Sequence, residues 1–236
     1  MLKVQEISKS FGEKQALKAI NFSVKRGQIA ALLGENGAGK STLLRILSGF
    51  IEPNTGTVDI DGVEISQDRQ AFLAQVGYVQ EISALYGEMN VYEFLNFVAD
   101  IRRVNAEDKK AKIKEVVDLL ELHDVIGQKN ETLSKGFKKR VELAAVLLAQ
   151  PTVLLLDEPT EGLDPNQKFS IRQTIKKYAK DHVIIISTHT LEDVEAVADS
   201  VLLLHKGELL TDAKLSDFKK KAKNDLLESF RKATKD

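Results

Sequence analysis

The stretch Gly34-Glu35-Asn36-Gly37-Ala38-Gly39-Lys40-Ser41-Thr42 decides how this chain folds. It follows an apolar run at residues 29–33 and opens a helical pattern over residues 41–47. A glycine-rich turn between a strand and a helix brings successive backbone N–H groups onto a phosphate, at the positive end of the helix. Lys40 then reaches the terminal phosphates, and the Ser41 hydroxyl is placed to hold Mg²⁺. We therefore expect a nucleoside triphosphate site rather than a loop that only turns the chain.

The size and composition of the chain exclude several classes of protein. With 236 residues, 43% of them apolar, the chain can bury the core of one large α/β domain or of a core with a subdomain. The absence of Cys excludes disulfides and thiolate metal sites. A net charge of −1 gives no overall attraction for nucleic acid, and no segment approaches the ~18 continuous apolar residues of a membrane helix. We expect a cytoplasmic protein with no nucleic-acid partner.

Short apolar runs alternate with helical patterns along most of the chain, as in proteins with a parallel sheet. Three runs are typical of buried strands: residues 28–33, 153–157 and 183–187. Before them, residues 1–27 and 57–63 alternate like half-buried strands, with turns at Phe11–Lys14 and Asp61-Gly62. The predicted helices cover residues 166–180 and 192–198 and much of residues 88–149, and the final strands are predicted at 201–205 and 208–211.

Two acids follow the second buried strand. Asp157 and Glu158 stand at its carboxyl end, which lies beside the phosphate loop in a sheet of this kind. Asp157 can help to hold Mg²⁺, directly or through water, and Glu158 can polarise the attacking water as general base. Alone, two adjacent acids could equally be a solvated strand end. Together with the phosphate loop, they favour hydrolysis.

Five motifs follow one another along the chain. They are Gly34–Thr42, Leu133-Ser134-Lys135-Gly136-Phe137-Lys138-Lys139-Arg140, Leu154–Pro159, Glu161-Gly162-Leu163-Asp164 and Ser187-Thr188-His189. In order and spacing, residues 1–212 resemble the nucleotide-binding subunits of ABC transporters, and the Leu-Ser-Lys-Gly form resembles the ABC-2 exporter type. The resemblance implies an α/β fold, a P-loop NTPase core with a mainly parallel sheet. It also implies an N-terminal antiparallel β subdomain, an inserted helical subdomain at about 82–150 and a basic C-terminal helical tail at 213–236.

The resemblance also implies a mechanism. In this family two subunits sandwich two ATP molecules head to tail, as a homodimer or a heterodimer with another ABC ATPase subunit. Ser134 and the backbone N–H of Gly136, at a helix N-terminus, would meet the γ-phosphate bound by the partner's loop. Asp164 would line the interface, although Asp164-Pro165 is also typical of a helix start. The movement would pass to a separately encoded transmembrane permease.

Further site residues come from the same resemblance. His189 would contact the γ-phosphate and position both the attacking water and Glu158. Phe11 would stack on adenine, with an ordinary core position as its alternative. In the loop Gly77–Glu81, the resemblance favours Glu81 as the residue that faces Mg²⁺ and leaves Gln80 as the alternative. The implied cofactors are ATP and Mg²⁺.

Three stretches carry further expectations. The signature replaces a glycine with Lys135 and a glutamine with Phe137, and basic residues at a helix N-terminus are easier to explain if phosphate lies nearby. Some apolar residues between 82 and 98 are expected to be exposed, because the family docks a helix of the permease there. The cluster Lys214, Lys219, Lys220, Lys221 and Lys223 predicts a solvated helix face, with contact to anionic lipid as the alternative.

We therefore predict an ATP-hydrolysing subunit that powers a membrane transporter, with export favoured, at the inner face of the cell membrane. The alternative is a soluble ABC-type ATPase that acts in cofactor assembly or another non-transport process. A small-molecule kinase is disfavoured, because the signature motif at residues 133–140 is foreign to such enzymes.

Overall fold

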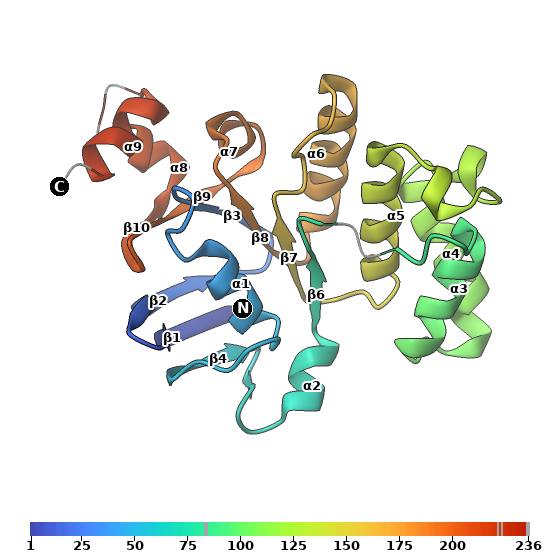
Figure 1. Ribbon diagram of the computed structural model, residues 1–236, viewed down its shortest axis with the longest axis horizontal. Helices are drawn as coiled ribbons and strands as arrows, with labels where there is room; N and C mark the ends of the chain where they lie inside the picture. The colour runs from blue at the N-terminus through green and yellow to red at the C-terminus, as the bar shows by residue number, and fades with distance from the viewer. Residues whose placement is uncertain (83–84, 221, 223, 235–236) are drawn as a thin grey trace.

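Two sheets form the body of the protein (Figure 1). The computed structural model describes residues 1–82, 85–220, 222 and 224–234. The larger sheet has the strand order β10-β9-β3-β8-β7-β6, and all its neighbouring strands are parallel except β9 and β10. Its strands are β3 (Gln28–Leu33), β6 (Val76–Val79), β7 (Val153–Asp157), β8 (Val183–Thr188), β9 (Ser200–His205) and β10 (Glu208–Lys214).

The register of the parallel strands brings their carboxyl ends to one edge. Gln28 pairs with Val183, which also pairs with Val153, and Val153 pairs with Val76. The three predicted buried strands are confirmed, because continuous apolar runs suit strands that are covered on both faces. The parallel set is larger than predicted, since β6 and β9 belong to it and Gly77, Tyr78 and Val79 lie in a strand rather than a loop.

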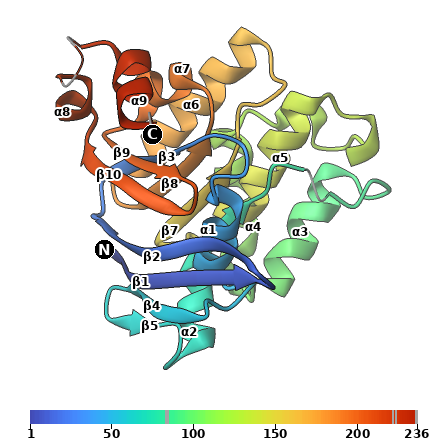
Figure 2. The same ribbon diagram turned by 60° about the vertical axis from the view of Figure 1, so that its left-hand side comes forward.

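A smaller antiparallel sheet packs below the first (Figure 2). Its order is β2-β1-β4-β5, and the predicted turns at Phe11–Lys14 and Asp61-Gly62 are confirmed. Helix α1 (Lys40–Leu47) follows β3, and its buried Leu43 and Leu44 share one apolar cluster with Val4 of the small sheet. The phosphate loop therefore leads into a helix that is fixed by both sheets. The strands are β1 (Leu2–Phe11), β2 (Lys14–Val24), β4 (Thr55–Ile60) and β5 (Val63–Glu64).

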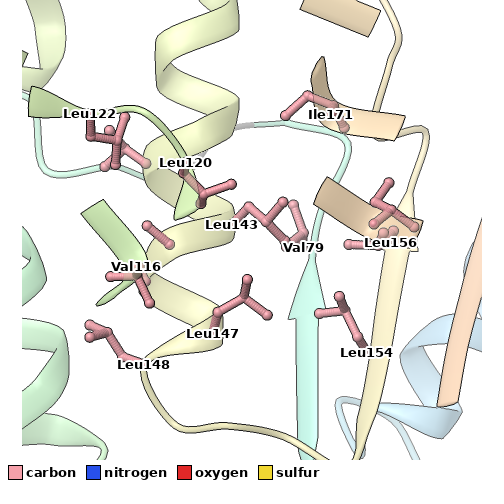
Figure 3. Close-up of a cluster of buried hydrophobic side chains, with 14 of the residues drawn as sticks. Val79, Val116, Leu120, Leu122, Leu143, Leu147, Leu148, Leu154, Leu156 and Ile171 are labelled. Atoms are coloured by element: carbon pink, nitrogen blue, oxygen red, sulfur yellow. The ribbon is translucent and has the colours of Figure 1, made fainter. Parts of the chain in front are cut away.

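The predicted helix-rich region forms a group of helices beyond β6 (Figure 1). Leu143 and Leu147 of α5, Val79 of β6 and Leu154 of β7 meet in one buried cluster (Figure 3). The helical region thus shares its core with the sheet, and a shift of α5 is felt at β6 and β7. The helices are α3 (Val91–Ile101), α4 (Ala106–Leu119) and α5 (Lys135–Leu147), with short turns η1 (His123–Val125) and η2 (Asn130–Thr132).

The remaining described helices are α2 (Arg69–Ala74), which contacts β5 of the smaller sheet, and four helices that pack on the larger sheet. The predicted helices near residues 166–180 and 192–198 are α6 (Pro165–Ala179) and α7 (Leu191–Val197), whereas α2 has no counterpart among the predictions. At the C-terminus, α8 (Leu215–Lys220) and α9 (Leu226–Thr234) pack on the sheet through Phe218 and Leu226, which share a cluster with Leu33.

The C-terminal lysines are only partly described. Lys219 pairs with Glu195 at 2.6 Å and Lys220 with Asp217 at 3.1 Å, and Lys214 is exposed on β10. Lys221 and Lys223 lie outside the described residues. In the described part of the chain, no helix has the length and apolar character needed to cross a membrane.

Candidate nucleotide site

The phosphate loop joins β3 to α1 in a shape that requires glycine. A Cβ on Gly34 would lie 2.3 Å from the carbonyl oxygen of Leu204. Gly39 has φ 112°, and a Cβ there would lie 2.8 Å from the carbonyl oxygen of Ala16. Gly37 also has a positive φ of 83°. The glycine spacing therefore reflects a tight loop pressed against β2 and β9, with its backbone free to face a ligand.

A cavity of about 570 Å³ opens above this loop. Residues from the carboxyl ends of β6, β7 and β8 reach it, because parallel strands end at the same edge of a sheet. The predicted site residues on its wall are Phe11, Asn36, Gly37, Gly39, Lys40, Ser41, Thr42, Glu81, Asp157, Glu158 and His189. The other predicted residues are not on the wall: Gly34, Glu35, Ala38, Gln80, Ser134, Gly136 and Asp164.

Part of the wall was not predicted from the sequence. Lys14, Gln15 and Ala16 of β2 line the cavity, as do Glu161 and the β9–β10 turn at Lys206-Gly207. That turn is tied to the phosphate loop, because the N–H of Gly207 donates to the carbonyl of Ala38 at 3.0 Å. The sequence marks residues 206–207 only as a turn, and no local pattern indicates which loop it will touch.

Lys40 is the buried cation of the site. The residue is only 7% exposed, and its Nζ donates to the carbonyls of Gly34 at 2.7 Å and Glu35 at 3.2 Å. Burial lowers the pKa of Lys40, and the nearby carboxylates of Glu158, Asp157 and Glu81 act in the opposite direction. The loop therefore holds a lysine among carboxylates, at the floor of the cavity.

Glu158 and His189 form a pair on the same wall. The Nδ1 atom of His189 lies 2.9 Å from Oε1 of Glu158. The backbone of Glu158 has a positive φ of 45°. The Glu158 N–H donates to the carbonyl of Ser187 at 3.0 Å, which fixes its backbone on β8. Burial raises the pKa of Glu158, although the His189 contact opposes this. A carboxylate of raised pKa is a better proton acceptor, as a general base requires.

Asp157 is buried beside Tyr78, whose hydroxyl donates to Oδ2 at 3.4 Å. Burial, together with the charge of Asp157, raises the pKa of Tyr78 to about 12, so this phenol stays protonated as a donor. Across residues 1–82, 85–220, 222 and 224–234, no three His, Cys, Asp or Glu side chains gather as a metal site. The wall nevertheless offers oxygen donors at Ser41, Asp157 and Glu81, which suit Mg²⁺ because that ion takes few protein ligands beside phosphate and water.

A second buried network, which no sequence pattern predicts, stabilises this wall. The hydroxyl of Thr160 donates to Oδ2 of Asp193 at 2.6 Å, and both residues are buried. Arg172 of α6 donates to the other Asp193 oxygen through Nη2 at 2.6 Å and Nε at 2.9 Å. Asp193 thus joins the segment after Glu158 to the helix after His189.

The structure distinguishes the two readings of Phe11, stacking partner or core residue, and separates Glu81 from Gln80. Phe11 is 52% exposed on the cavity wall, so the ordinary core position considered for it is wrong. Glu81 lines the same wall. Gln80 instead lines a separate hollow of about 170 Å³ beside Phe94 and Val98 of α3.

Ser134, Gly136 and Asp164 gather at two neighbouring helix N-termini. Ser134 caps α5, with its hydroxyl accepting from the Phe137 N–H at 3.4 Å, and Asp164 caps α6, as its sequence pattern predicts. A Cβ on Gly136 would lie 2.5 Å from the side-chain carbon of Gln167, so α5 and α6 are close together there.

Two of the basic residues near the start of α5 bind other parts of the chain. Lys139 Nζ donates to backbone carbonyls of Gln80 and Glu81. Arg140 donates to Glu121 at 2.9 Å and to the Leu120 carbonyl at 3.4 Å. Lys139 and Arg140 thus have protein partners of their own, and a nearby phosphate stays a prediction.

Known proteins are similar to this chain in sequence. The family model described as ABC transporter matches residues 17–161. The uncharacterized ABC transporter ATP-binding protein YxlF of Bacillus subtilis (strain 168) is 34% identical over 93% of this chain and 72% of its own length. The linearmycin resistance ATP-binding protein LnrL of the same strain is 33% identical over 89% of this chain and 68% of its own. The bacitracin transport ATP-binding protein BcrA of Bacillus licheniformis is 33% identical over 94% and 72%.

Solved structures share the fold. The ATP-binding subunit of an ABC transporter superposes with a TM-score of 0.90 at 28% identity, over 100% of both chains. The cbiO1 protein of Clostridium perfringens, part of the ABC transporter complex cbiONQ, gives 0.83 at 30% identity over 94% of this chain and 91% of its own. A dimeric post-hydrolysis state of the cassette MJ0796 bound to ADP and Pi gives 0.81 at 25% identity, over 91% and 98%. The chain therefore belongs to the ATP-binding proteins of ABC transporters, and it is an ATPase of that family.

Proposed function

We propose that two such subunits close around two ATP molecules, and that this cycle drives export through separately encoded membrane-spanning subunits. The observation that carries the proposal is the division of the site residues. Lys40, Glu158 and His189 share one cavity wall, whereas Ser134 and Gly136 stand away from it at a helix N-terminus. A helix N-terminus attracts an anion, so a second copy can use it to complete the site.

Within one subunit, the chain's own residues have distinct tasks. Lys40 leaves the carbonyls of Gly34 and Glu35 to meet the terminal phosphates, and the loop N–H groups hold the phosphates from the other side. Glu158 accepts a proton from the attacking water, and the Nδ1 contact at 2.9 Å orients His189 beside it. Phe11 offers an exposed ring for the base.

A bound Mg²⁺ would neutralise charge that develops on the phosphates. Ser41 and Asp157 would hold it, and Glu81 rather than Gln80 would face it, since Glu81 is the one of the two on the cavity wall.

Asp164 caps α6 beside Gly136, which supports its placement at the proposed interface between subunits. The dimeric state of the MJ0796 cassette gives independent support for pairing, as a homodimer or as a heterodimer with another ABC ATPase subunit. We further assign residues 1–212 to the nucleotide-binding domain, about 82–150 to its helical subdomain, and 213–236 to a C-terminal extension.

Two observations favour a membrane partner over a soluble ABC-type ATPase in cofactor assembly. As expected for a docking region, Ile82, Tyr86 and Tyr92 are exposed near the start of α3. The relatives include a resistance protein and a bacitracin transport protein, and cbiO1 is part of a transporter complex. Resistance by transport requires movement away from the target, so we favour export, with the subunit on the inner face of the cell membrane.

The proposal is tested by affinity purification of the tagged chain from detergent-solubilised membranes of its own organism. A protein with membrane-spanning helices should co-purify with wild-type chain, and a variant with Tyr86→Lys and Tyr92→Lys should lose it while keeping ATPase activity. Recovery of a wholly soluble complex that is unaffected by these substitutions would favour the cofactor-assembly alternative.

A further inference from the structure

Lys139 is a buried cation outside the cavity. Its side chain is 8% exposed, on the second turn of α5. Nζ donates to the carbonyls of Gln80 at 2.7 Å and Glu81 at 3.1 Å, and it lies 3.4 Å from Oε2 of Glu142. Two of the three N–H donors of the ammonium group bind these carbonyls, and the Glu142 carboxylate adds an ion pair. A lysine this buried is uncommon without such partners.

The contact links two functional parts of the chain. On one side, residues 80 and 81 follow β6, and the Glu81 side chain enters the wall shared with Lys40 and Asp157. On the other side, α5 begins directly after Ser134, its N-cap. The Lys139 ammonium group therefore adds a polar link between the cavity wall and the signature helix.

The two carbonyl contacts fall on residues whose neighbourhoods differ. Glu81 lines the nucleotide cavity, whereas Gln80 lines the separate hollow beside α3. A donor that binds both carbonyls fixes two successive peptide units. Without it, the segment can rotate about its soft backbone dihedrals and withdraw the Glu81 carboxylate from the wall.

We propose that Lys139 is a positioning residue, which holds Glu81 toward the phosphates and couples its place to the helix that begins after Ser134. The inference rests on the proposed function, because the value of holding Glu81 depends on its facing Mg²⁺. It also gives a role to a basic residue near the start of α5.

The test is a pair of substitutions that keeps the buried site neutral. Lys139→Met preserves length and volume, and Glu142→Gln removes the carboxylate that would otherwise lose its cation. The K139M/E142Q variant should lose about tenfold in kcat and need several-fold more Mg²⁺ for half-maximal ATPase activity, with ATP affinity kept within about twofold. The control E142Q should keep wild-type activity, and K139R/E142Q, which restores a cation, should recover part of kcat.

Non-additivity separates positioning from a merely structural role. If Lys139 acts through Glu81, then adding K139M/E142Q to Glu81→Ala should lower kcat by less than about twofold further. The inference would be overturned if kcat of the combined variant fell by the product of the two separate decreases. It would also be overturned if K139M/E142Q needed no more Mg²⁺ than wild type for half-maximal activity.

The same series distinguishes the inference from the proposed function. If Glu81→Ala lowers kcat and K139M/E142Q does not, only the positioning by Lys139 is overturned. If Glu81→Ala leaves kcat and the Mg²⁺ midpoint at wild-type values, the proposed metal role of Glu81 fails, and the positioning inference is overturned with it.

Discussion

Replacement of Lys40 by Met should separate nucleotide binding from folding. The lysine donates to the carbonyls of Gly34 and Glu35 and is attracted by nearby carboxylates. Met has a similar length and is apolar, so it fills the same space without the cation. In the wild-type chain the ammonium is proposed to exchange its carbonyl partners for phosphate oxygens when ATP binds.

The expected magnitude follows from this exchange. A hydrogen bond to a charged group contributes about 1.5–3 kcal/mol, which at ~1.4 kcal/mol per factor of ten weakens ATP binding by about 10- to 150-fold. The free energy of unfolding should change by less than about 1 kcal/mol. The loss of two hydrogen bonds is offset by the removal of a desolvated cation, and the Glu35 carbonyl keeps its bond from the Ala38 N–H at 3.1 Å.

The assay is a calorimetric titration with ATP and Mg²⁺, paired with a thermal melt of the free protein. Lys14→Met is the matched control, because Lys14 lies on the same cavity wall but is exposed. It should weaken binding by less than about threefold, as expected of a screened surface charge. An ATP affinity of Lys40→Met within about threefold of wild type would refute the assignment of Lys40 to the phosphates.

Three further predictions concern other parts of the site. Burial raises the pKa of Glu158 above its ordinary 4.5, so the acid limb of the kcat/KM profile should lie above pH 4.5. The folded state then binds this proton more tightly than the unfolded state, so the free energy of unfolding falls as pH rises through the raised pKa. The melting temperature of Glu158→Gln should therefore be no lower than that of the wild type at pH 7. A clear drop in that temperature would contradict the raised pKa. Phe11→Ala should weaken ATP binding by about 3- to 12-fold through lost stacking. The melting temperature of the protein should not change, because the Phe11 side chain is 52% exposed. An equal loss of affinity for inorganic triphosphate would argue against the base as the partner of Phe11. Ser134→Ala removes the α5 cap and should lower stability by about 1 kcal/mol, with monomer ATP affinity unchanged; a weakened monomer affinity would place Ser134 in the subunit's own site.

The elements that could be predicted from the sequence are those defined by local patterns. Residues 29–33 and 153–156 are continuous apolar runs, and the structure has strands at the predicted bounds, 28–33 and 153–157. The short strand β6 was missed because it has only four residues, includes Gly77 and finds its partner Val153 far along the chain. A propensity signal cannot register a pairing of that separation.

The candidate site divides in the same way. Glycine spacing and the acids after a buried strand locate Lys40 and Glu158 from the sequence alone, because each belongs to a local motif. The Asp193 brace and the Lys139 contact depend on side chains that meet only after α5, α6 and α7 have packed on the sheet. Such contacts join residues that share no local pattern, so they become visible only in three dimensions.

The central claim is that one chain carries half of each site, and its most direct test is the mass of Glu158→Gln in solution. Light scattering should show a single chain of 26.2 kDa without nucleotide and twice that mass with ATP and Mg²⁺. Adding Ser134→Ala to this variant should keep the protein monomeric in the presence of ATP. A mass that stays at 26.2 kDa when ATP is bound, as shown by titration of the same sample, would contradict the account.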